Sequence, residues 1–381
     1  MSKKMEVGLK KILVVLGTRP EAIKLAPVIL QLKKIQGFDV EVVSTGQHTN
    51  LVNTMLDLFS VQADMVFNTL EVAKTLPQVV SNVLKDAEVV IERTQPDLVI
   101  VQGDTASAFA FALAAFYNQI EVAHVEAGLR SYNKLSPFPE ELNRVYIAQI
   151  AKYHFAPTEV SKKNLLKEGI EEDNIFVVGN TSIDALRLIL GDERFNAKNV
   201  QNLTSSKKQI LLTQHRRENF SRHENGVFKA VAQIAHEYGS NIEIIFPMHP
   251  NPVVREASKS YFENLSNIKL IEPLDYQDFS NLMASSYLIV TDSGGVQEEA
   301  PSLNVPALIT RDTTERTEIV SLGAAKLVGV EEKAVFNAIT NLLDDEKSYE
   351  SMRHKQNPYG DGHSSLRISN VLVDKLQFRN A

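Results

Sequence analysis

The chain contains no cysteine and no tryptophan among its 381 residues. Without cysteine it cannot form a disulfide, use a thiolate nucleophile, or hold zinc or an iron–sulfur cluster through sulfur. The sequence also lacks the GxGxxG fingerprint of dinucleotide-binding folds and the GxxxxGKS/T loop that cradles nucleotide phosphates. These absences argue against cysteine chemistry, against NAD as a cofactor, and against a P-loop ATP site.

The chain also has no excess of basic residues and no long apolar run. Its formal net charge is -7, which argues against nucleic acid or an anionic membrane surface as the main partner. No apolar run approaches the ~20 residues of a membrane span. The N-terminal run ILVVLG is too short for a signal peptide and is typical of a buried strand. We therefore expect a cytoplasmic protein with no membrane or nucleic-acid partner.

Short β-branched runs alternate with helical stretches along the chain. KILVVLG, DVEVVSTG, DLVIVQGD and EVAHVEAG are examples in the first half, and QILLTQ, NIEIIFPMH and YLIVTDSGG in the second. Near-continuous apolar strands predict parallel sheets covered on both faces. The polar stretch 191–208 separates the two series. We predict an N-terminal Rossmann-like domain over 1–185, joined by a C-terminal helix over 362–381, and a second Rossmann-like domain over 186–361.

Glycines and basic residues follow several of these strands, at the edge where doubly wound sheets bind ligands. In TDSGG, the backbone of Ser293, Gly294 and Gly295 opens a helix and suits an anion. A plain turn with Ser293 as helix N-cap explains the same residues. Arg19 and Lys24, after the first strand, suit phosphate contacts or a solvated basic pair.

His215, with Arg216 and Arg217, follows the first strand of the second series. These side chains suit a diphosphate clamp, and an exposed helix start is equally compatible with them. The two readings stay open on the residues alone.

Acidic residues gather at strand ends and in a proline-rich loop, HVEAGLRSYNKLSPFPEELNR, over 124–144. Asp104 and Glu126 end strands, and Glu140 follows Pro139. Two of them have a simpler explanation: Asp104 could cap a helix, and Glu140 could favour a helix N-terminus. Together, three carboxylates in one half and cations in the other indicate acid–base chemistry beside a phosphate leaving group. No DxD or HExxH motif accompanies them, so we predict no metal site.

The motifs GTRPEAIKLAPV, VQGDT, HVEAGLR, SPFPEELNR, HFAPTE, VGNTSIDAL, HRREN, TDSGGVQEEAPSL and RDTTER resemble, in this order, the non-hydrolysing UDP-N-acetylglucosamine 2-epimerase family. The resemblance runs from about Lys11 to NPYGDG at 357–362. It implies the GT-B-type fold, in which two Rossmann-like doubly wound domains hold the active site in the cleft between them. It also implies cofactor-free interconversion of UDP-GlcNAc and UDP-ManNAc, through elimination of UDP to 2-acetamidoglucal and re-addition, for cell-surface polysaccharide.

The resemblance also implies roles for individual residues. The acid–base candidates are Asp104, Glu126 and Glu140, carried to the sugar by strand ends and by the proline-braced loop. His215 and Arg19 would stabilise the diphosphate, with Lys24 as a further substrate contact. The remaining nucleotide contacts would be the backbone of Ser293, Gly294 and Gly295, the ribose-binding Glu299, the uracil pocket of Leu274 and Phe279, and Arg316.

Rival functions remain at this point. They are a hydrolysing epimerase that releases ManNAc and UDP, a GT-B glycosyltransferase, and an inactive nucleotide-sugar binder. The resemblance further implies a homodimer. Gln47 and His249 fit an allosteric site for a second UDP-GlcNAc, whereas Asn50 and 72–75 do not clearly match it.

Overall fold

The computed structural model describes residues 9–46, 49–68, 73, 75–191, 200, 203, 206–215 and 225–377. The described part of the chain divides into two compact units, assigned as Met1–Ala185 with Tyr359–Ala381 and as Leu186–Pro358. Most of the polar stretch 191–208 lies outside the described residues, as does Gln47.

The described residues of the first unit form a seven-stranded parallel sheet in the order β3-β2-β1-β4-β5-β6-β7. The strands are β1 (Lys10–Leu16), β2 (Phe38–Ser44), β3 (Met65–Val66), β4 (Leu98–Gln102), β5 (Glu121–Val125), β6 (Tyr153–Ala156) and β7 (Ile175–Val177). The helices are α1 (Arg19–Leu32), α2 (Thr49–Leu58), α4 (Leu76–Thr94), α5 (Ala106–Tyr117), α6 (Glu140–Ile150), α7 (Glu159–Lys167) and α16 (Ser364–Gln377), and α8 (Thr181–Gly191) contains the boundary between the units.

The described residues of the second unit form a six-stranded parallel sheet in the order β10-β9-β8-β11-β12-β13. The strands are β8 (Lys208–Thr213), β9 (Ile242–Pro247), β10 (Ile268–Ile271), β11 (Leu288–Thr291), β12 (Ala307–Ile309) and β13 (Ala325–Leu327). The helices are α9 (Gly226–Tyr238), α10 (Pro252–Phe262), α11 (Tyr276–Ser285), α12 (Gly294–Glu299), α13 (Thr317–Ser321), α14 (Glu332–Asp344) and α15 (Glu346–Met352). Two doubly wound parallel domains were predicted, and the structure confirms them.

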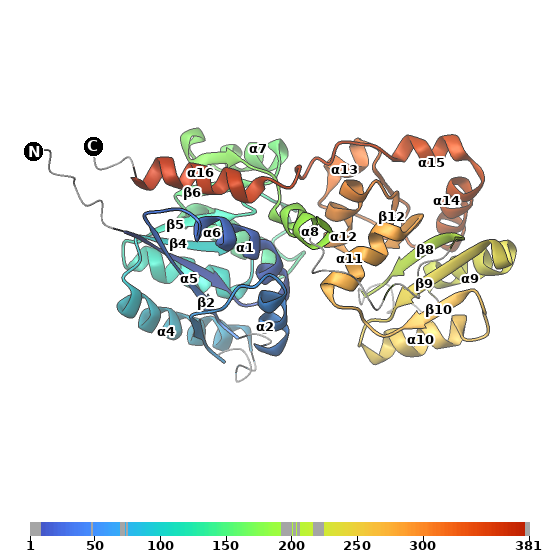
Figure 1. Ribbon diagram of the computed structural model, residues 1–381, viewed down its shortest axis with the longest axis horizontal. Helices are drawn as coiled ribbons and strands as arrows, with labels where there is room; N and C mark the ends of the chain where they lie inside the picture. Colours follow the sequence, from blue (N-terminus) through green and yellow to red (C-terminus); the bar gives the residue numbers. More distant parts are fainter. Residues whose placement is uncertain are drawn as a thin grey trace, which may run out of the picture. The chain divides into compact units, whose positions relative to one another are not determined.

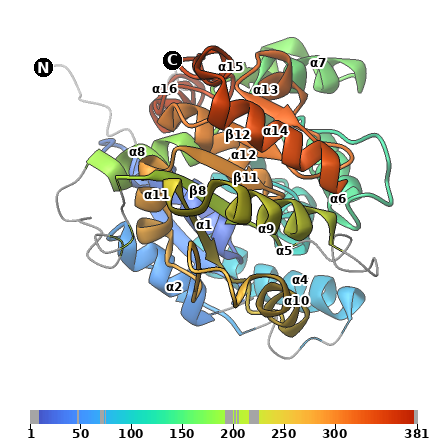
Figure 2. The same cartoon turned by 90° about the vertical axis from the view of Figure 1, so that its right-hand side faces the viewer.

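The apolar strands are buried on both faces, as their composition predicts. In β1, Leu13 and Val15 pack into an apolar cluster with α4, α5 and α6, while Ile12 and Val14 point to the opposite face and are also buried. In the second unit, α9 contacts both α10 and α14 over a similar cluster (Figure 2). Helices therefore cover the sheets, and polar side chains are left to the strand ends and loops.

Helix starts follow from single residues in the sequence. Thr158 caps α7 by accepting the Ser161 N–H, and Thr105 caps α5 in the same way. The C-terminal helix α16 returns to the first unit, where it contacts α1 (Figure 1). Its first turn is held by Asp184, whose carboxylate accepts the Ser365 N–H at 2.7 Å. Among the described residues, no helix is both long and apolar enough to cross a membrane.

Candidate active site

In each sheet the strand order reverses between two neighbouring strands, β1 and β4 in the first unit and β8 and β11 in the second. Open α/β sheets bind ligands beyond the carboxyl ends of the strands at such a reversal. Arg19 and Asp104 follow β1 and β4, and His215 and Ser293 follow β8 and β11. The candidate residues of each unit thus lie at the edge where the topology favours a ligand.

The turn between β1 and α1 is built by a buried carboxylate that the sequence analysis missed. Glu21 accepts the N–H groups of Gly17 and Thr18 at 3.0 and 2.7 Å, and the hydroxyl of Thr105 at 2.7 Å. Burial raises the pKa of Glu21 above its ordinary value, against these hydrogen bonds. The signal was present, because T-R-P-E is a capping box. Glu21 therefore fixes the start of α1, where Arg19 lies, against the start of α5.

Glu126 is held by one residue of α1 and by one residue just before α8. Its Oε2 pairs with Lys24 of α1 and accepts the Asn180 Nδ2–H at 2.9 Å. Glu126 itself has a left-handed backbone with a φ of 66°, an uncommon conformation for a residue with a side chain. The structure thus brings together two predicted site residues, Lys24 and Glu126, and adds Asn180. Such strained backbone is found at functional sites more often than elsewhere.

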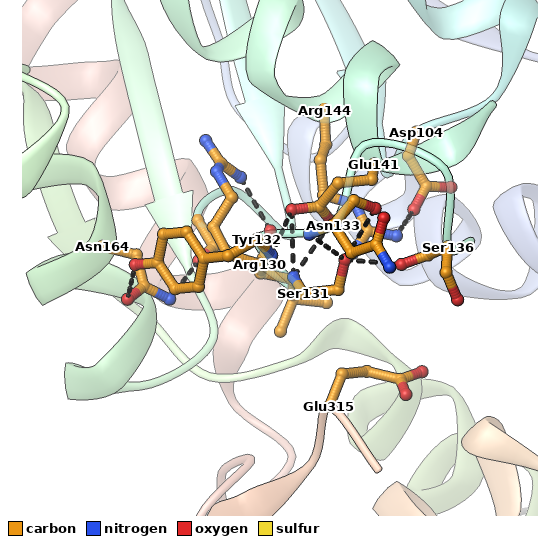
Figure 3. A network of polar contacts seen from close by, with 12 residues as sticks. Asp104, Arg130, Ser131, Tyr132, Asn133, Ser136, Glu141, Arg144, Asn164 and Glu315 are labelled. Carbon is orange, nitrogen blue, oxygen red and sulfur yellow. Dashed lines mark hydrogen bonds and ion pairs between the residues drawn. The ribbon is translucent and has the colours of Figure 1, made fainter. Parts of the chain in front are cut away.

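Asp104 lies between β4 and α5 and pairs through Oδ2 with Arg144 of α6 (Figure 3). Its side chain is 25% exposed, and Asn143 donates to its backbone carbonyl at 2.9 Å. Burial raises the pKa of the Asp104 carboxyl above its ordinary value; Arg144 opposes this, and Glu126 and Glu140 add to it. A carboxyl whose pKa is raised toward neutrality is suited to give and take protons.

A buried histidine holds the turn that carries Asp104. His124 of β5 donates from Nε2 to the carbonyl of Gly103 at 2.7 Å. Burial lowers the pKa of His124 to about 3, so the ring is neutral at physiological pH. Its role is to hold the Gly103–Asp104 turn, which the sequence analysis did not foresee because His124 lies inside an apolar strand.

The loop of residues 131–139 leads into α6, whose first residue is Glu140. The Ser136–Pro137 and Phe138–Pro139 peptide bonds are both cis. Glu140 is partly exposed, whereas its neighbour Glu141 is buried. The two adjacent glutamates therefore have different environments: Glu140 can meet a ligand, and Glu141 faces the protein.

In the second unit, His215 is fixed by Asp292, a residue that the sequence analysis did not single out. The fully buried Asp292 carboxylate accepts the His215 backbone N–H at 2.9 Å and lies 2.7 Å from its Nδ1. Because Nδ1 lies against this carboxylate, Nε2 is on the opposite side of the ring, and the side chain is 40% exposed. His215 is thus oriented to present Nε2 to a ligand.

The SGG turn is shaped by Arg316. An added Cβ at Gly294 would lie 2.8 Å from the Arg316 guanidinium carbon, so a side chain there would displace Arg316. Arg316 donates from Nε to the buried Glu298 at 2.8 Å, its Nη2 lies 2.7 Å from the same carboxylate, and it also pairs with Glu315. Ser293 precedes the helix start without a side-chain cap. Arg316 therefore lies against the SGG turn with its charge paired by two glutamates, and the backbone amides of the turn are the groups suited to an anion.

Three further predicted contacts lie in the same unit. Glu299 is buried and accepts the Tyr276 hydroxyl at 3.2 Å. Leu274 precedes α11 and Phe279 lies within it, both partly exposed. These placements put a carboxylate and two apolar side chains around α11 and α12.

The residues assigned to a second ligand site are only partly described. Gln47 lies outside the described residues, as do Arg216 and Arg217. The His249 ring stacks on His215 with centroids 6.0 Å apart. Burial lowers the pKa of His249, and the neighbouring His215 lowers it further. In the ranges given above, no group of three or more His, Asp or Glu side chains is arranged for a metal ion.

Comparison with known proteins defines the class to which this fold and these residues belong. Residues 30–373 match the family model described as UDP-N-acetylglucosamine 2-epimerase. The UDP-N-acetylglucosamine 2-epimerase of Bacillus subtilis is 47% identical over 369 residues, covering 97% of this chain and 96% of that protein. Two solved structures agree with the sequence match. One is UDP-GlcNAc 2-epimerase from Neisseria meningitidis bound to UDP-GlcNAc, with 42% identity, 96% and 100% coverage and a TM-score of 0.88. The other is S. aureus MnaA with UDP, with 43% identity, 98% coverage of each chain and a TM-score of 0.90.

The two Rossmann-like sheets and these neighbours place the chain among α/β proteins of the GT-B type. The chain belongs to the UDP-N-acetylglucosamine 2-epimerase family. It is therefore an epimerase, and the family resemblance seen in its motifs is confirmed.

Proposed function

We propose that this enzyme interconverts UDP-GlcNAc and UDP-ManNAc by the non-hydrolysing route, without a cofactor. The observation that carries the proposal is the set of carboxylates at one sheet edge, with Asp104 in an environment that raises its pKa. The C2 proton of the sugar is not next to a carbonyl, so an acid–base group alone cannot remove it near neutral pH. Elimination of UDP from C1 allows the proton to leave, because the electrons of the C2–H bond then form a C1–C2 double bond.

In the proposed reaction, the C1–O bond breaks and its electron pair leaves with UDP. A carboxylate takes the C2 proton, and a C1–C2 double bond forms, giving 2-acetamidoglucal. UDP then adds back at C1 while C2 receives a proton on its other face. No water is consumed, so the products are the two UDP-sugars alone. Asp104, Glu126 and Glu140 are the proposed acid–base groups.

The second unit would hold UDP throughout. We assign the diphosphate to His215, the amides of Ser293, Gly294 and Gly295, and Arg316. Glu299 would bind the ribose hydroxyls, and Leu274 and Phe279 the uracil. Arg19 would add charge at the diphosphate, and Lys24 would act on the sugar side through Glu126.

The test is a product analysis of purified enzyme incubated with UDP-GlcNAc. We expect UDP-ManNAc to accumulate to equilibrium with no matching rise in free UDP. Stoichiometric release of UDP and ManNAc would instead identify a hydrolysing enzyme. Transfer to an added acceptor would identify a glycosyltransferase, and no turnover would identify an inactive binder.

We also propose that a second UDP-GlcNAc activates the enzyme through a site that includes Gln47 and His249. The support is the stacking of His249 on His215, which would link such a site to the diphosphate. Initial velocity with UDP-ManNAc as sole substrate should then be low and rise when a trace of UDP-GlcNAc is added. Normal turnover from the start would contradict the activation.

The cellular setting is proposed from the family alone. The enzyme would work in the cytoplasm as a homodimer that supplies UDP-ManNAc for cell-surface polysaccharide. Light scattering should give about twice the chain mass of 42.5 kDa. A monomeric mass at working concentration would exclude the dimer.

A further inference from the structure

The buried carboxylate of Glu141 contacts the 131–139 loop and also lies near the arginine that pairs with Asp104, a candidate acid–base group. It accepts the Ser131 N–H at 3.0 Å on both oxygens and the Tyr132 N–H at 2.8 Å (Figure 3). These are the first residues of the loop. A carboxylate that is only 3% exposed requires such donors, because burial without them is costly.

One helical turn later, Arg144 lies between two carboxylates. Its Nη1 is 3.3 Å from Glu141, and its Nη2 pairs with Asp104. Among the described residues, Nε and Nη1 of Arg144 have no partner in hydrogen-bond geometry. The guanidinium is therefore hydrogen-bonded to Asp104 and attracted to Glu141 by charge. Its position depends on the balance between the two acids.

We propose that Glu141 is a positioning residue, which anchors the 131–139 loop through Ser131 and Tyr132 and at the same time sets how Arg144 engages Asp104. The same carboxylate thus holds the loop that leads into Glu140 and attracts Arg144, the cation that pairs with Asp104. Movement of the loop would be transmitted to Asp104 through one guanidinium. Only the expected change in kcat rests on the proposed function. The effect of Glu141 on Asp104 does not depend on it.

The direction of the effect on Asp104 follows from charge. The groups that act on Asp104 are Arg144 and Glu140 of α6 and Glu126 after β5, together with burial. Removing the Glu141 charge leaves Arg144 with Asp104 as its main carboxylate partner. Stronger pairing with a cation favours the charged carboxylate, so the pKa of Asp104 should fall.

The test compares Glu141→Gln with wild type in two measurements. A ¹³C titration of the Asp104 carboxyl, assigned by loss of its signal in Asp104→Asn, needs no substrate. We expect the Asp104 midpoint to move to lower pH in Glu141→Gln. We also expect kcat to fall about 10- to 100-fold, as for misplaced catalytic groups, with its pH dependence displaced the same way.

Glu168→Gln is the matched control. Glu168 accepts two hydrogen bonds from Arg130, next to the same loop, at 2.7 Å each, and in the described part of the chain its carboxylate pairs with neither Arg144 nor Asp104. This change loosens the loop base and should leave the Asp104 midpoint in place. Glu141→Asp keeps the charge, so its Asp104 midpoint should also stay near that of wild type, even if Glu141→Gln folds poorly.

An unchanged Asp104 midpoint in folded Glu141→Gln would overturn the proposal, as would the same displacement in Glu168→Gln or Glu141→Asp. A displaced midpoint with unchanged kcat would overturn the role in positioning a catalytic group. If wild type does not epimerise UDP-GlcNAc, the proposed function fails, and the titration alone decides whether Glu141 acts on Asp104.

Discussion

Replacing Asp104 with asparagine is expected to abolish epimerisation while leaving UDP binding intact. The amide has nearly the same shape as the carboxyl but cannot exchange a proton. Losing a well-placed acid–base group costs on the order of 100- to 10,000-fold in rate. The environment of Asp104, which raises its pKa through burial, marks it as such a group. Turnover of UDP-GlcNAc measures the loss of epimerisation, and calorimetry measures whether UDP still binds.

The control for this change is Asp97→Asn, at the opposite end of the same strand. Asp97 bonds Lys10 and the Lys11 N–H and is substantially exposed, so its loss should leave turnover near wild type. Near-normal turnover in folded Asp104→Asn would show that Asp104 is not an acid–base group. Glu126→Gln is expected to behave as Asp104→Asn does, and the same result would remove Glu126 from the reaction.

Replacing Asp292 with asparagine is expected to lower kcat by about 100- to 10,000-fold. In serine proteases, the same change at the buried aspartate that orients the catalytic histidine costs about 10,000-fold, because the wrong tautomer is favoured. Asp292 is placed similarly, with one carboxylate oxygen 2.7 Å from Nδ1 of His215 and the other accepting the His215 backbone N–H at 2.9 Å. In this variant, the ¹⁵N shifts of the His215 ring should show a mixture of tautomers, with the proton on Nδ1 in only some of the molecules.

Asp344→Asn serves as the control in the second unit. Asp344 accepts the Tyr238 hydroxyl at 2.9 Å near the end of α14, and among the described residues its carboxylate pairs with neither His215 nor the SGG turn. Its loss should change neither kcat nor the ring shifts. If Asp292→Asn keeps wild-type kcat with an altered tautomer, the orientation of His215 does not limit the reaction.

The sequence predicted the sheets well because parallel strands are buried on both faces. KILVVLG and DLVIVQGD became β1 and β4 for that reason, and Thr158 became an N-cap because its hydroxyl has a nearby N–H to accept. The start of helix α4 also has a local signal, Thr75 as N-cap and a proline in the first turn, which the sequence analysis did not use. The contacts that decide these elements lie within a few residues, so local rules can predict them, including the two starts that were missed, at Thr75 and Thr18.

The partners of the site residues could not be predicted in the same way. Asp292 lies 77 residues from His215, and Arg144 lies 40 residues from Asp104. No pattern in a single sequence encodes such pairs, since they depend on which strand ends meet. Glu140 and Glu141 are adjacent and chemically alike, and burial alone separates the one that can meet a ligand from the one that holds the loop.

The most direct test of the account is a time course by NMR, with purified enzyme and UDP-GlcNAc in deuterated water. The proposed elimination exchanges the C2 proton with groups that equilibrate with solvent. The account predicts UDP-ManNAc carrying deuterium at C2, with no accumulation of free UDP. UDP-ManNAc that retains hydrogen at C2, or release of free ManNAc and UDP, would contradict it.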